Sequence, residues 1–147
     1  MTLIVAWIGK TKSAAIQSLT EDYLRRLEHY AKVEGVALRD EAALLKLCHG
    51  DSRNHPRRLI LIDRVGQQLS SEEWAQFLRS QAERSSGVLL FAIGPADGFS
   101  QAARQQAHTS LSLGKITLPH ELARVVVLEQ LYRALTILKG HPYHLGH

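Results

Sequence analysis

The chain is poor in cysteine, and Cys48 is the only one among its 147 residues. A single cysteine excludes an internal disulfide, and no cysteine spacing marks a metal site, which is typical of a reducing cytoplasm. Long apolar runs are also lacking, because residues 3–8 and 88–93 are too short for a signal segment or a membrane span. We therefore expect a cytoplasmic protein with no membrane segment and no bound metal.

Acidic residues are fewer than basic ones, with 14 Asp and Glu against 18 Lys and Arg and a net charge of +4. A basic surplus favours a polyanionic partner through counterion release, but a soluble protein with a few extra surface cations has the same composition. Hydrophobic residues make up 45% of the chain, which suffices for a core. The length then predicts a single domain over residues 1–147.

Apolar runs and helical patterns alternate along the chain. Strands are predicted at residues 3–8, 33–38, 59–62 and 88–93, and helices at residues 13–31, 41–48, 70–84 and 119–139. The polar segment 49–56 is a predicted loop with His49 and His55 at the surface. Alternating strands and helices form βαβ units, so the fold class is α/β, with a mostly parallel sheet flanked by helices. The pattern alone favours an open doubly wound sheet, because knotted chains are nearly absent among proteins.

The last predicted helix is apolar around its whole circumference. It begins at Pro119, since proline at the first helical position loses only an N–H that has no intrahelical partner, and it ends before Gly140. At about 100° per residue its apolar side chains point in nearly every direction. One domain core covers one side of such a helix, so a second copy of the chain is expected on the other. We predict a homodimer.

Ligands of parallel sheets bind outside the carboxyl ends of the strands, and three candidate loops lie there: residues 62–63 after one strand, 94–98 after the next and 111–118 before the long helix. Residues 94–98 read Gly-Pro-Ala-Asp-Gly and precede Ser100, a predicted helix N-cap. The glycines allow close backbone approach to a flat ligand, although glycines between a strand and a helix are more often only a turn. Neither a Rossmann glycine fingerprint nor a P-loop is present, which agrees with a ligand held without phosphate contacts.

The C-terminal part of the chain contains Leu-Pro-His at residues 118–120, Leu-Tyr-Arg-Ala at 131–134 and Pro-Tyr-His at 142–144. With the segment 88–144 around them, these motifs closely resemble the ribosomal large-subunit methyltransferase H family, small enzymes of the SPOUT class. The resemblance implies one SPOUT domain whose C-terminal segment forms a trefoil knot that binds S-adenosyl-L-methionine. The residues matching the family's cofactor site are Ile62, Gly94, Leu113, Gly114, Lys115, Ile116, Thr117 and Leu118.

The resemblance also implies the reaction, which is methylation of N3 of a pseudouridine in 23S rRNA by a homodimer. His144 matches the family's tail, which reaches over the cofactor site of the partner subunit. Histidine titrates near neutral pH, as a general base requires, and stabilisation of the imide anion fits equally well. Tyr143 is expected to stack on the base, and Arg133 to contact the acceptor or a phosphate. A small dimer without an added RNA-binding domain is expected to need the assembled ribosome as its substrate.

Each of these residues also has a structural interpretation. Arg133 is spaced to form an i,i+4 ion pair with Glu129, and this interpretation is slightly favoured. Tyr143 and His144 alternatively form only an ordered tail, although the functional role is favoured for both. His120 is expected to order the start of the long helix rather than to take part in chemistry.

Two places in the sequence depart from the family pattern. Pro95 stands where a second glycine is usual, and it has a fixed φ and no N–H to offer a ligand. The ending Leu145-Gly146-His147 replaces a basic residue and so removes a phosphate contact. Two other functions therefore stay open: methylation of another RNA, and binding of RNA or the ribosome without catalysis.

Overall fold

The computed structural model describes residues 1–50, 57–84 and 87–145, with the backbone alone at residues 144–145. Strands alternate with helices, which confirms the α/β class. Of the predicted loop 49–56, residues 51–56 with His55 lie outside the described residues, whereas His49 is the last residue of α2. The elements are, in chain order, β1 (Thr2–Ile8), α1 (Ala14–Leu27), β2 (Lys32–Leu38), α2 (Glu41–His49), β3 (Arg58–Gln68), α3 (Ser71–Arg84), β4 (Val88–Ile93), α4 (Gln101–Gln106), β5 (Thr109–Ser112), α5 (His120–Lys139) and the 3-10 helix η1 (Pro142–Leu145).

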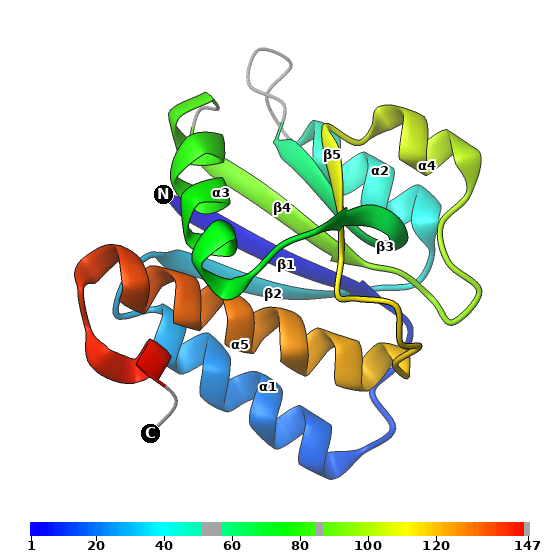
Figure 1. Ribbon diagram of the computed structural model, residues 1–147. Helices are drawn as coiled ribbons and strands as arrows, with labels where there is room; N and C mark the ends of the chain where they lie inside the picture. Colours follow the sequence, from blue (N-terminus) through cyan, green and yellow to red (C-terminus); the bar gives the residue numbers. More distant parts are fainter. Residues whose placement is uncertain (51–56, 85–86, 146–147) are drawn as a thin grey trace.

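The strands form one parallel sheet in the order β2-β1-β4-β3-β5. Helices α1, α3 and α5 cover one face of this sheet and α2 and α4 the other, which gives three layers (Figure 1). Because the strands are parallel, their carboxyl ends meet at one edge of the sheet. The mostly parallel sheet flanked by helices is thus confirmed, while the trefoil knot stays a prediction.

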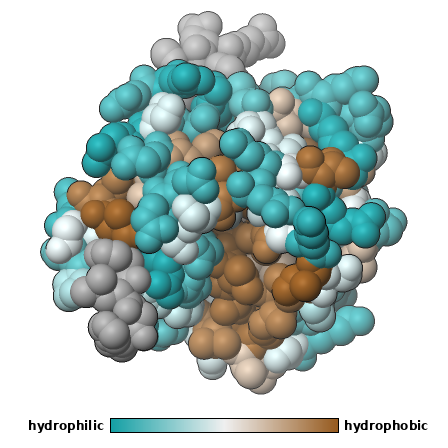
Figure 2. Space-filling view, viewed as in Figure 1, coloured by the Kyte–Doolittle hydropathy of each residue, from teal (hydrophilic) through white to brown (hydrophobic). Residues whose placement is uncertain are grey.

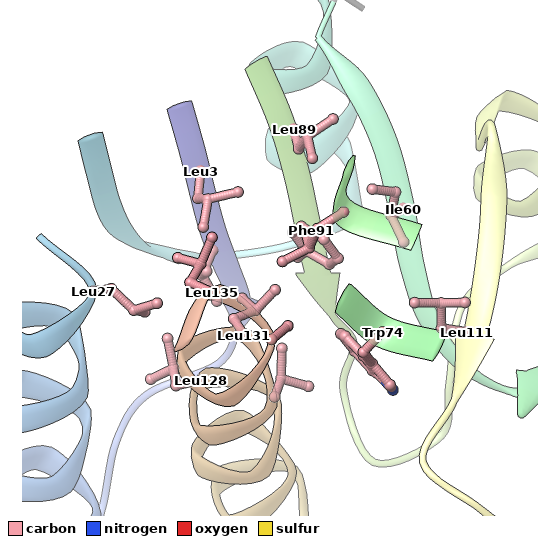
Figure 3. Close-up of a cluster of buried hydrophobic side chains, with 14 of the residues drawn as sticks. Leu3, Leu27, Ile60, Trp74, Leu89, Phe91, Leu111, Leu128, Leu131 and Leu135 are labelled. Carbon is pink, nitrogen blue, oxygen red and sulfur yellow. The ribbon is translucent and has the colours of Figure 1, made fainter. Parts of the chain in front are cut away.

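The core has two parts, one on each face of the sheet. Leu3 and Val5 of β1 point toward α1, α3 and α5, whereas the alternate residues Ile4 and Ala6 point toward α2 and α4. All of them are buried, as expected for a strand covered on both faces. Figure 3 shows the leucines of α5, among them Leu131, packed beneath β1 and β4. The apolar runs therefore form interior strands because both of their faces have a helical layer to pack against.

Helix ends follow the capping signals of the sequence. In the capping box before α3, the Ser70 N–H donates to Glu73 Oε1 at 2.8 Å and the Glu73 N–H donates to Ser70 Oγ at 3.1 Å. Pro119 is the N-cap of α5, so the helix begins at His120, one residue after the predicted start, and Gly140 ends it in the left-handed conformation. α1 ends at Leu27, earlier than predicted, because the chain turns there to enter β2.

β3 is longer than the sequence predicts. The apolar run stops at Ile62, whereas β3 continues to Gln68. Ile62 and Gln67 pair with the same β5 residue, Leu111, so the residues between them bulge out of the ladder. β5 itself occupies the start of the predicted loop 111–118. Its four residues carry no strand pattern of their own, and pairing with β3 alone defines it.

α5 is buried within the chain along one side. Val127 and Leu131 are fully buried, while Leu122, on a different side, is 42% exposed. Figure 2 shows apolar residues gathered at the surface where α5 and α1 lie side by side. Part of the apolar circumference of α5 thus remains at the surface of a single chain.

Candidate functional site

A cavity of about 290 Å³ lies at the carboxyl ends of β4 and β5, beside the bulge in β3. Its walls are the bulge after Ile62, the turn at residues 94–99, the loop at 112–118 and the first turn of α5. Lys115 is exposed and does not line the cavity. The other residues predicted to hold the cofactor all line it: Ile62, Gly94, Leu113, Gly114, Ile116, Thr117 and Leu118. Segments that are far apart in the sequence therefore line one cavity.

The turn after β4 is fixed by close packing of its glycine. A Cβ at Gly94 would lie 2.9 Å from the ring of Phe99, a buried residue that also lines the cavity. The Gly98 N–H donates to the Pro95 carbonyl oxygen at 2.9 Å, which closes the turn. Pro95 therefore fits as the first residue of a turn, where its carbonyl group is used.

The loop after β5 is shaped by a buried serine. Ser112 is 3% exposed, and its Oγ accepts from the Gly114 N–H at 3.1 Å and donates to the Gly114 carbonyl oxygen at 3.0 Å. This local ring of hydrogen bonds turns the chain directly below the cavity. The backbone of residues 113–118 then passes along the cavity wall.

The first turn of α5 holds the loop that follows β1. Glu121 accepts from the N–H of Lys12 at 2.9 Å and from the N–H of Ser13 at 3.1 Å. The Ser13 hydrogen bond is the main reason why the pKa of Glu121 is lowered. His120 precedes it and lines the cavity, so the structure places it at the site as well as at the start of the helix.

An ion pair in the cavity wall was not predicted. Arg104 of α4 donates from Nε to Asp63 Oδ2 at 2.7 Å and from Nη2 to Asp63 Oδ1 at 3.3 Å. The pair raises the pKa of Arg104, chiefly through the hydrogen bond to Asp63. The two residues are 41 positions apart, so no sequence spacing indicates their contact. The only sequence signal was the position of Asp63 at the end of a buried run.

The C-terminal tail packs on its own chain. The Tyr143 hydroxyl lies 3.2 Å from the Tyr23 hydroxyl and donates to Glu129 Oε1 at 3.3 Å, and its ring meets that of Tyr132 edge-on at 4.7 Å. Arg133 donates to the same Glu129 carboxylate from Nε at 2.9 Å, which confirms the predicted i,i+4 ion pair. Burial raises the pKa of Tyr143, so its phenol stays protonated at neutral pH.

Two of the three predicted catalytic residues, Arg133 and Tyr143, lie away from the cavity of their own chain. α5 begins at the cavity with His120 and runs for 20 residues, which corresponds to about 30 Å, before the tail starts. Neither Arg133 nor Tyr143 lines the cavity. His144 lies in η1, and its side chain is outside the described part of the structure. Within one chain, the two halves of the predicted site are separate.

Two further findings concern the described residues alone. No group of three or more His, Cys, Asp or Glu side chains among them is arranged to hold a metal ion. None of their helices has the length and apolar character needed to cross a membrane.

Two solved structures share this fold. A probable methyltransferase from Bordetella pertussis Tohama I matches with a TM-score of 0.56 at 12% identity, covering 91% of this chain and 95% of its own. A probable methylase family protein from Haemophilus influenzae Rd KW20 matches with a TM-score of 0.57 at 14% identity, covering 95% and 69%. The fold is therefore that of a class of α/β proteins that includes one described as a probable methyltransferase and one described as a probable methylase family protein.

Sequence comparison narrows this class. Residues 1–144 match the family described as predicted SPOUT methyltransferase. The ribosomal RNA large subunit methyltransferase H of Koribacter versatilis strain Ellin345 is 54% identical over 147 residues, covering 100% of both chains. The protein of the same name from Deinococcus radiodurans is 40% identical over 151 residues, covering 99% of this chain and 100% of its own. This chain belongs to the SPOUT methyltransferases and, among them, to the ribosomal RNA large subunit methyltransferase H family.

Proposed function

We propose that this protein transfers the methyl group of S-adenosyl-L-methionine to N3 of a pseudouridine in 23S rRNA. The observation that carries the proposal is the cavity, which is lined by all the residues matching the family's cofactor site except Lys115. Relatives that match over the whole chain are named ribosomal RNA large subunit methyltransferase H, which supports rRNA of the large subunit as the acceptor. The protein then acts in the cytoplasm, on ribosomes.

The cavity suits this cofactor in shape and chemistry. Ile62, Phe99 and Leu118 offer apolar surfaces to a flat purine, and the loop at residues 112–118 offers backbone polar groups. The charged pair Asp63–Arg104 offers partners to an amino-acid group. When bound, S-adenosylmethionine supplies an electrophilic methyl group, and the protein's task is to align the acceptor and remove a proton. We expect the trefoil knot to shape the same loops.

The acceptor nitrogen carries an imide proton that must leave as the methyl group arrives. We propose that His144 assists this step, either by removing the proton directly or by stabilising the imide anion. The raised pKa of Tyr143 keeps its phenol protonated at neutral pH, so Tyr143 cannot accept this proton, and we assign it to stacking on the target base. Arg133, oriented by Glu129, supplies a cation beside the acceptor or a phosphate.

A second copy of the chain is needed to complete this site. The tail lies about 30 Å along α5 from the cavity of its own chain, so the tail that covers a cavity belongs to another subunit. The exposed Leu122 and the apolar surface shared by α5 and α1 offer the contact area for that subunit. We therefore propose a homodimer with two composite sites.

Methyl transfer to ribosomes tests this proposal. Ribosomes from cells that lack the modification are incubated with labelled S-adenosylmethionine and the protein, beside free 23S rRNA. We expect label in the large subunit, little in free rRNA, and a loss of about a hundredfold in His144→Ala. His29→Ala, which changes an exposed histidine on the loop after α1, is the matched control and keeps its activity.

The outcomes separate the alternatives. A folded dimer that binds S-adenosylmethionine but leaves every ribosomal particle unlabelled excludes the rRNA acceptor and leaves methylation of another RNA. A folded dimer that does not bind the cofactor in calorimetry excludes methyl transfer altogether. That second result leaves binding of RNA or the ribosome without catalysis.

A further inference from the structure

The bulge in β3 places a buried carboxylate in the cavity wall. Ile62 and Gln67 both pair with Leu111, so residues 63–66 leave the ladder at the point where the cavity begins. Gly66 allows this, because a Cβ there would lie 2.6 Å from the Leu111 backbone. The Asp63 side chain, at the start of the bulge, is only 5% exposed. A carboxylate so deeply buried needs a partner.

Arg104 is that partner, and the geometry leaves part of its guanidinium available. Nε and Nη2 engage the two Asp63 oxygens at 2.7 Å and 3.3 Å, so one edge of the planar group is used. The Nη1 group has no hydrogen-bond partner within the described residues, and the Arg104 side chain is 36% exposed at the cavity wall. The pair thus holds a cation in a fixed orientation with donors left for a ligand.

Arg64 also lines the cavity, but it lacks this support. It is exposed, and no hydrogen bond or ion pair with another described residue holds its side chain. Binding a ligand through Arg64 costs the full rotamer entropy of a long side chain, whereas the Asp63 contact has already restricted Arg104. Of the two arginines, Arg104 is the one prepared to bind an anion with defined geometry.

We propose that Arg104, oriented by Asp63, binds the α-carboxylate of the amino-acid part of the cofactor. A guanidinium edge matches a planar carboxylate in shape and charge, and the adenosyl part has no anionic group to compete for it. The inference rests on the proposed cofactor and adds the anchoring residue for one end of it. Asp63 is a positioning residue that acts through Arg104.

Binding of two adenosyl thioethers to the intact protein tests this assignment without any turnover. S-adenosylhomocysteine carries the amino-acid part, and 5′-methylthioadenosine has the same adenosyl thioether without it. For Arg104→Gln, calorimetry is expected to show a loss of about ten- to hundredfold for S-adenosylhomocysteine and less than about twofold for methylthioadenosine. Arg64→Gln is the matched control, with both affinities within about twofold of the wild type.

Two more variants protect the test against a folding defect. Arg104→Lys keeps the positive charge but loses the planar guanidinium with its paired N–H donors. Compared with Arg104→Gln, it is therefore expected to recover only part of the selectivity for S-adenosylhomocysteine. Asp63→Asn leaves Arg104 in place but weakens its orientation, and the same selectivity falls. A loss of equal size for both thioethers in Arg104→Gln overturns the assignment, because it indicates a structural role. Equal affinities of the wild type for S-adenosylhomocysteine and methylthioadenosine also overturn the assignment. A wild type that binds neither compound refutes the proposal that the protein binds this cofactor.

Discussion

The separation of the tail from the cavity leads to a complementation experiment between two inactive variants. His144→Ala removes the proposed base and leaves the cavity intact. Gly94→Val blocks the cavity instead, because even a Cβ at Gly94 would lie 2.9 Å from the Phe99 ring, and a larger side chain displaces that ring into the cavity. If the tail serves the other subunit, a heterodimer of the two variants contains one complete site.

The structure sets the expected magnitude. Since about 30 Å of helix lies between a cavity and the tail of its own chain, a tail cannot serve that cavity without unfolding α5. In the heterodimer, the intact cavity of the His144→Ala subunit meets the intact tail of the Gly94→Val subunit. We expect about half of the wild-type activity per dimer, because one of two equivalent sites is restored. Each parent homodimer has two defective sites.

The assay uses co-expressed subunits with two different affinity tags, purified in succession so that only heterodimers remain. Methyl transfer to unmodified ribosomes is then compared with that of the wild type and both parents, and light scattering confirms the dimer mass. A heterodimer as inactive as its parents would refute the composite site, and so would a wild-type protein that is monomeric at assay concentration.

Two predictions concern stability. Arg124 is fully buried against the Trp7 ring, and its Nε and Nη2 atoms have no partner among the described residues. Arg124→Met is therefore expected to raise the free energy of unfolding by about 1 kcal/mol in urea titrations. A decrease of similar size in the free energy of unfolding would contradict this reasoning. His108 accepts the Leu59 N–H at its Nδ1, and its pKa is lowered mainly by burial. As pH falls below the ordinary value of 6.5, the unfolded chain takes up a proton that the folded chain does not. The free energy of unfolding should then fall by at most about 1.4 kcal/mol per pH unit. Between pH 6.5 and 5, the free energy of unfolding of His108→Gln should depend less steeply on pH than that of the wild type. Identical pH dependences would exclude His108 as the cause.

Local signals in the sequence determined much of the fold. The bounds of β4 match the prediction from an uninterrupted apolar run, since such a run fits a strand that is covered on both faces. The capping box at Ser70 and Glu73 places the start of α3, because both partners lie within four residues of one another. Alternation of these elements fixed the α/β class. These features depend on residues that are close together in the chain, so they can be predicted from the sequence alone.

The site could be predicted only in part. Family motifs predict the backbone segments that line the cavity, but no motif predicts the ion pair between Asp63 and Arg104. Gly94 and Leu118 lie in segments that match the family, and both line the cavity. The contact between Asp63 and Arg104 depends on a bulge in β3 and on the placement of α4 beside it, and neither has a local pattern. A short strand such as β5 has too few residues for periodicity, and it exists only through pairing with β3.

The sequence by itself determined the order and type of most elements, the apolar character of α5 and the segments that line the cavity. Tertiary structure alone decided which side of α5 is buried, where the bulge opens and which charges meet in the cavity. It also decided that the tail lies far from the cavity of its own chain. The physical reason is that hydrophobic periodicity and capping act over a few residues, whereas pairing, packing and ion pairs join segments whose separation in sequence carries no signal.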